Sequence, residues 1–62
     1  MIDNLTVKQL TVLIEAGRKR GYDTVQTVKN IDYLMEMYYY DLSLDEAYRE
    51  CLKYLNNMKQ RG

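Results

Sequence analysis

Three helix-capping motifs divide this chain, and they restrict its fold more than any other sequence feature. Residues 6–9 (TVKQ) have the form of a capping box, in which a hydroxyl accepts from the backbone N–H three residues later and the glutamine reaches back. Residues 23–26 (DTVQ) resemble a second cap, and residues 43–46 (SLDE) have the form of a full capping box. The motifs predict three helices that begin near residues 7, 24 and 44.

Signals for the helix ends are fewer. Gly21 can adopt the left-handed conformation that stops a helix, which predicts a first helix over 7–20. An alternative is that this helix stops at Gly17 and that residues 18–20 belong to the loop. No proline interrupts the remaining segments, so we expect helices over 24–40 and 44–60 within a single domain spanning 1–62.

Apolar residues recur at alternating spacings of three and four along the predicted helices, which is typical of helices packed in a bundle. Because the connections are short, neighbouring helices should be antiparallel, and we expect an all-α, up-down-up three-helix bundle. Gly17 lies on the inner face, where the missing side chain would allow close helix approach. The predicted inner stripes are Val7, Leu10, Leu13, Ile14 and Gly17; Val28, Ile31, Met35 and Tyr38; and Leu44, Tyr48, Cys51, Leu55 and Met58.

The small size of the chain limits how it can be stabilised. A folded chain of 62 residues removes only about 60% of its unfolded surface from water. One cysteine cannot form an internal disulfide, and the absence of histidine argues against the usual zinc sites. Regular helix packing and self-association remain as ways to stabilise the fold.

Composition argues against several partner classes. Nine basic and nine acidic side chains give zero formal net charge, so no overall field attracts nucleic acid or anionic lipid. No apolar run approaches the roughly 18 residues of a membrane span, and the first residues lack the pattern of a signal peptide. We therefore expect a cytoplasmic protein that does not interact with membranes.

Residues suited to catalysis are scarce. No histidine can act as a base near neutral pH, the only serine, Ser43, is explained as an N-cap, and Cys51 lies on a core stripe. Asp45 and Glu46 occupy a first helical turn, where carboxylates favour the helix dipole without any metal. The sequence also contains no glycine-rich phosphate loop. We expect no enzymatic activity, cofactor, metal or small-molecule substrate.

A second apolar stripe on the predicted helix 24–40 suggests a binding surface. Tyr33, Met37 and Tyr40 align at i, i+4 and i+7, roughly opposite the inner stripe. Tyrosine and methionine are frequent at protein interfaces, so we expect this stripe to bind a protein partner or a second copy. Alternatively, the rings lie on the surface with their hydroxyls in water. Tyr54 and Val12 are weaker exposed candidates.

Clustered charges offer a rival hypothesis. In an up-down-up bundle, the ends of the first and third helices share one pole, and this pole could bind nucleic acid through phosphate contacts. Cations at helix C-termini also compensate the helix dipole without any partner, and the opposite, acidic pole could instead mimic nucleic acid. The basic residues are Arg18, Lys19, Arg20, Lys59 and Arg61; the acidic ones are Asp3, Asp41, Asp45 and Glu46.

Overall fold

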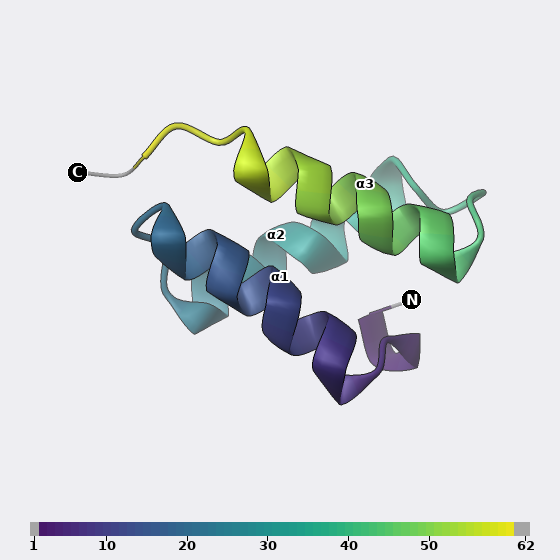
Figure 1. The fold of residues 1–62 in the computed structure, drawn as a ribbon. Helices are drawn as coiled ribbons and strands as arrows, with labels where there is room; N and C mark the ends of the chain where they lie inside the picture. The colour runs from purple at the N-terminus through teal and green to yellow at the C-terminus, as the bar shows by residue number, and fades with distance from the viewer. Residues whose placement is uncertain (1, 61–62) are drawn as a thin grey trace.

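The computed structural model describes residues 2–60 and shows a three-helix bundle. A short 3₁₀ turn, η1 (Ile2–Asn4), precedes α1 (Val7–Lys19), α2 (Thr24–Met37) and α3 (Leu44–Asn56). α1 and α3 run in the same direction and α2 runs against them, so the predicted up-down-up topology is confirmed (Figure 1). The α1–α2 turn and the end of α3 lie at one end of the bundle (Figure 1).

All three helices begin at the positions predicted from the caps. Thr6 Oγ1 accepts a hydrogen bond from the Gln9 backbone amide at 3.0 Å, and Gln9 Oε1 accepts one from the Thr6 backbone amide at 3.0 Å. The box at residues 23–26 is also complete. The third cap is only half of the predicted box: Ser43 Oγ accepts from the Glu46 amide, but its hydroxyl also donates to the Glu46 carboxylate at 3.1 Å. Glu46 therefore binds the side chain of its cap instead of the cap's backbone.

The end of α1 follows its predicted stop signal. Gly21 has φ of 87°, its amide donates to the Arg18 carbonyl at 3.0 Å, and the Tyr22 amide donates to the Gly17 carbonyl at 3.0 Å. This pair of bonds is a Schellman motif, which satisfies carbonyls that the helix leaves without partners. The helix continues through Gly17, so the alternative of an early stop there is wrong.

The predicted ends of the other two helices are wrong by three or four residues. α2 ends at Met37 instead of residue 40, with the amides of Tyr38 and Tyr39 both donating to the Leu34 carbonyl at 2.9 Å. α3 ends at Asn56 instead of residue 60. The Asn57 side chain donates to the Lys53 carbonyl at 2.9 Å. In both places the last carbonyls accept hydrogen bonds from nearby donors. Neither end has a glycine, so the sequence carries no local signal for the stop.

The core lies between the three helices, and two residues that were predicted to face it are exposed instead. Val7 is 83% exposed because it occupies the first turn of α1, and Tyr38 is 62% exposed because it follows the end of α2. Instead, Ala16, Thr27 and Leu34 point inward. The buried apolar side chains are Leu13, Ala16, Ile31, Leu34, Met35, Ala47, Cys51 and Leu55.

α1 and α2 approach closely at Gly17. A Cβ atom added there would lie 2.2 Å from Thr27 Oγ1 and 2.8 Å from Thr27 Cγ2. The Thr27 hydroxyl donates to the Asp23 carbonyl at 2.9 Å, so this fully buried polar group is satisfied. Thr27 therefore packs directly on the Gly17 backbone, as the predicted role of this glycine requires.

The three helices do not pack equally on one another. α1 contacts α2 and α3 extensively, whereas α2 and α3 contact each other less. A hollow at the surface is lined by α3, the segment after it, Tyr22 before α2 and Tyr39 after α2, and its side chains are mainly polar and aromatic.

Candidate functional site

The most prominent exposed apolar feature lies on the last turns of α2 and directly after it. Tyr33, Met37, Tyr38 and Tyr40 each expose more than half of their surface. We call these four residues the tyrosine face. The exposure predicted for Tyr33, Met37 and Tyr40 is therefore present, although the α2 helix carries only the first two.

The arrangement within the tyrosine face differs from the predicted stripe. Because α2 ends at Met37, Tyr40 lies in the following loop and does not continue the i, i+4, i+7 alignment. Tyr38 packs against Tyr33 instead, with ring centroids 5.9 Å apart and an interplanar angle of 71°. Hydrogen bonding to Tyr38 and the charge that Tyr38 can carry raise the pKa of Tyr33. Sequence reasoning missed Tyr38 because the apolar spacing placed it in the core.

Opposite charges flank Tyr33 along α2. Lys29 lies one turn before Tyr33, and Glu36 lies one turn after it; both side chains are exposed. Neither takes part in an ion pair within residues 2–60. At 100° per residue, the three positions share one side of the helix. The charge on this side of α2 therefore changes sign from one side of Tyr33 to the other.

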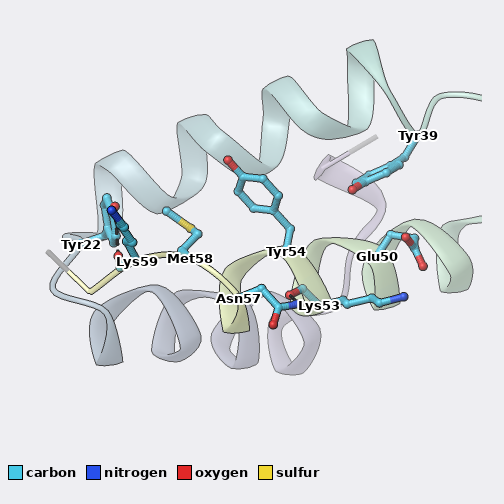
Figure 2. Close-up of a pocket in the computed structure, with 8 residues that line it drawn as sticks. All are labelled: Tyr22, Tyr39, Glu50, Lys53, Tyr54, Asn57, Met58 and Lys59. Atoms are coloured by element: carbon cyan, nitrogen blue, oxygen red, sulfur yellow. Dashed lines mark hydrogen bonds between the residues drawn. The ribbon is translucent and has the colours of Figure 1, made fainter.

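A separate hollow of about 580 Å³ opens along the seam between α2 and α3. We call it the tyrosine groove. Figure 2 shows Tyr39 and Tyr54 projecting into the seam, with Met58 and Tyr22 toward the other end. The groove is lined by Tyr22, Tyr39, Glu50, Lys53, Tyr54, Asn57, Met58 and Lys59.

Contacts between distant segments shape this groove. The Tyr22 hydroxyl donates to the Lys59 carbonyl at 3.5 Å, which ties the α1–α2 turn to the chain after α3. Desolvation, followed by the nearby Cys51, Glu50 and Tyr54 side chains, raises the pKa of Tyr39, so its hydroxyl stays protonated to a higher pH than that of an ordinary tyrosine. A smaller hollow shares Tyr39 and Tyr54 and also includes Tyr33 and Tyr38, so it lies between the groove and the tyrosine face.

Of the two weaker exposed candidates, Tyr54 lines the groove and is 44% exposed, whereas Val12 lies on α1 beside a different hollow. The groove itself was not predicted. Its three tyrosines are separated by 17 and 15 residues in sequence, from 22 to 39 and from 39 to 54, and no local pattern links them. Only the separation of α2 from α3 brings them to one surface.

The predicted basic pole is partly engaged with the protein itself. Arg20 donates from its guanidinium to the Asn56 carbonyl at the end of α3, and Arg18 pairs with Glu15 at 3.3 Å. The Gln60 side chain donates to the Lys19 carbonyl at 3.4 Å, so the two chain segments do share this end of the bundle. Arg61 lies outside the described residues. Binding of nucleic acid through Arg18, Lys19, Arg20 and Lys59 stays a prediction.

Cys51 is placed where a thiol is unreactive. It is fully buried, and burial together with the Glu50 charge raises the pKa of its thiol to about 11. Because the thiolate is the reactive form, attack by this sulfur is disfavoured at neutral pH. Ser43 caps α3 as predicted. Among residues 2–60, no cluster of three potential metal-ligating side chains occurs.

The raised thiol pKa predicts a loss of stability in alkali. The unfolded chain releases the Cys51 proton above its ordinary pKa of 9.0, while the folded chain holds it until about 11. Unfolding is therefore favoured progressively between these pH values, by up to about 3 kcal/mol in total. Urea unfolding of the wild type and of Cys51→Ala, repeated from neutral pH upward, measures this loss of stability. The tyrosines also titrate in alkali, but they do so in both proteins, so the difference between the two curves reports on Cys51. Parallel stability curves would contradict the assigned environment of the thiol.

Two further findings bear on the class of protein. Within residues 2–60, no helix has the length and apolar character needed to cross a membrane. No protein-family model, curated protein or solved structure matches the chain. The function must therefore be argued from the surfaces of this chain.

Proposed function

We propose that this protein is a small interaction module that associates with a second copy of itself through the tyrosine face. The observation that carries the proposal is the exposure of four large side chains, Tyr33, Met37, Tyr38 and Tyr40, at one end of α2. Tyrosine and methionine supply a large contact area and are enriched at interfaces. The Tyr33–Tyr38 contact also holds two of the rings in a defined arrangement before any partner binds.

Charge complementarity favours a second copy as the partner. If two α2 helices pair antiparallel about Tyr33, the residue four positions before it faces the residue four positions after it. Lys29 of one copy then lies beside Met37 and Glu36 of the other, and two-fold symmetry forms this ionic contact twice. Antiparallel pairing also brings the opposite ends of the two helix dipoles together.

The size of the protein supports the same partner. Its accessible surface is 4397 Å², and a standard interface of about 800 Å² per partner would cover roughly a fifth of that surface. A domain this small has little apolar burial of its own. Pairing would bury additional apolar surface and so stabilise the fold, as a disulfide or a metal site does in other small domains.

Replacing Tyr33 tests the proposed interface. Tyr33→Ser removes the ring at the centre of the pairing, so we expect the dimer dissociation constant to rise about tenfold or more. Val7→Ser is the matched control, because Val7 is also apolar and highly exposed but lies on α1. Sedimentation equilibrium measures the dissociation constant, and circular dichroism checks that both variants remain helical. Equal effects of the two substitutions would contradict a specific role for the tyrosine face.

A charge exchange tests the antiparallel arrangement within the same experiment. Lys29→Glu and Glu36→Lys should each weaken the dimer, because each places like charges together across the interface. The double variant restores opposite charges and should recover most of the lost affinity. Failure of the double variant to recover affinity would rule out antiparallel pairing of α2 about Tyr33.

A further inference from the structure

The tyrosine groove has an unusual chemical lining for a hollow between two helices. Met58 is its only fully apolar side chain, and the remaining residues present three phenol rings, an amide, two lysines and one carboxylate. Groups able to donate a hydrogen bond therefore outnumber carboxylates: these groups are the Tyr39 and Tyr54 hydroxyls and the Lys53 and Lys59 ammonium groups, whereas the Asn57 amide already donates to the Lys53 carbonyl. The groove suits a ligand that combines flat apolar surfaces with backbone acceptors.

We propose that the tyrosine groove binds an extended, proline-rich segment of another protein. A polyproline II segment has no internal hydrogen bonds, so its carbonyls remain available to the Tyr39 and Tyr54 hydroxyls. Its rings pack on aromatic faces, and its preformed conformation lowers the entropy lost on binding.

Other occupants fit this lining less well. The backbone groups of an α-helix are already bonded internally, and its apolar face would need aliphatic anchor sites that the groove lacks. A second copy cannot supply the ligand, because the chain contains no proline. The inference therefore goes beyond self-association and concerns a different surface, since no residue of the tyrosine face lines this groove.

Charge along the groove gives the ligand a direction. Lys59 lies toward the Tyr22 end, whereas Glu50 and the Lys53 side chain, which have opposite charges, both lie toward the Tyr39 end (Figure 2). When only its rings and carbonyls are recognised, a proline-rich segment binds in either direction, so a charged flank must distinguish the two directions. The geometry fits an acidic flank of the ligand beside Lys59.

The test is a titration of isotope-labelled protein with a blocked oligoproline peptide, followed by NMR. We expect saturable shifts of the Lys53, Tyr54 and Asn57 amide signals and no response to a glycine-serine peptide of equal length. Tyr54→Ala should lower the affinity about tenfold or more, because the ring projects into the groove. Tyr40→Ala is the matched control, since Tyr40 is exposed outside the groove and should leave affinity unchanged.

Three results would overturn the proposal. These are absence of saturable shifts with oligoproline, unchanged affinity in Tyr54→Ala, and stronger binding of an amphipathic helical peptide or a single-stranded oligonucleotide. The titration is repeated on Tyr33→Ser, where binding should persist because Tyr33 does not line the groove. Failure of self-association and failure of peptide binding are then distinguishable.

A glutamate added to one end of the oligoproline tests the direction. It should increase the affinity for the wild type and give no increase for Lys59→Gln. Equal gains in both proteins would contradict the assigned orientation.

Discussion

Replacing Gly17 by alanine is expected to destabilise the protein by about 2 kcal/mol, a typical cost of overpacking. Helix propensity alone predicts the opposite, a gain of about 1 kcal/mol. Packing decides the sign, because the new Cβ atom would lie 2.2 Å from Thr27 Oγ1. Thr27 cannot move easily: its side chain is branched at Cβ, fully buried and bonded to the Asp23 carbonyl. Urea unfolding followed by circular dichroism measures the change.

A second substitution shows whether the Thr27 contact is the cause. Thr27→Ala removes Oγ1 and Cγ2, the two atoms closest to the added Cβ. The double variant should therefore be more stable than the sum of the two single effects, by about 1 kcal/mol or more. Additive effects, or a Gly17→Ala protein more stable than the wild type, would mean that α1 and α2 are not as close as the structure places them.

Truncating Leu55 is expected to have the largest effect of all, a loss of about 3 kcal/mol of unfolding free energy. Leu55 is fully buried in the core between the helices, so alanine leaves a cavity that the stiff packing only partly fills. Domains of this size rarely have more than about 3–5 kcal/mol of stability. Leu55→Ala should consequently leave much of the protein unfolded at room temperature, as measured by the helical signal in water.

The neighbouring residue is the matched control for Leu55. Tyr54 precedes it on α3 but is 44% exposed and faces the tyrosine groove, so Tyr54→Ala should cost less than about 1 kcal/mol. This difference also matters for function, because Tyr54→Ala must remain folded to report on peptide binding. Equal destabilisation by the two substitutions would place Tyr54 in the core and contradict its role in the groove.

Helix starts could be predicted from the sequence because caps are local. Each capping hydroxyl or carboxylate satisfies an amide three residues away, so a four-residue pattern contains the whole interaction. Helix ends were predictable only at Gly21, where a left-handed residue is required. After Met37 and Asn56 neither glycine nor proline marks a stop, and the last carbonyls accept instead from local donors such as the Tyr39 amide and the Asn57 side chain.

The inner stripes were predicted well except at two helix ends, where Val7 and Tyr38 are exposed, and at the close contact of Thr27 with Gly17. Hydrophobic spacing identified Leu13, Ile31 and Leu55, which are fully buried. It could not identify Thr27, because a polar side chain becomes the right contact only when Gly17 lies against it.

The surfaces show a similar division. Exposure of Tyr33, Met37 and Tyr40 followed from helix periodicity, but the place of Tyr38 depended on where α2 ends. The tyrosine groove joins residues from three separate segments. Its existence depends on how the fold brings these segments together, which no local sequence pattern of this chain specifies.

Sedimentation equilibrium of the unmodified protein over a wide concentration range is the most direct measurement of the proposed function. Self-association through the tyrosine face predicts a reversible monomer–dimer equilibrium that Tyr33→Ser shifts toward monomer and Val7→Ser leaves in place. A protein that remains monomeric at every concentration, or a dimer that Tyr33→Ser does not weaken, would contradict it.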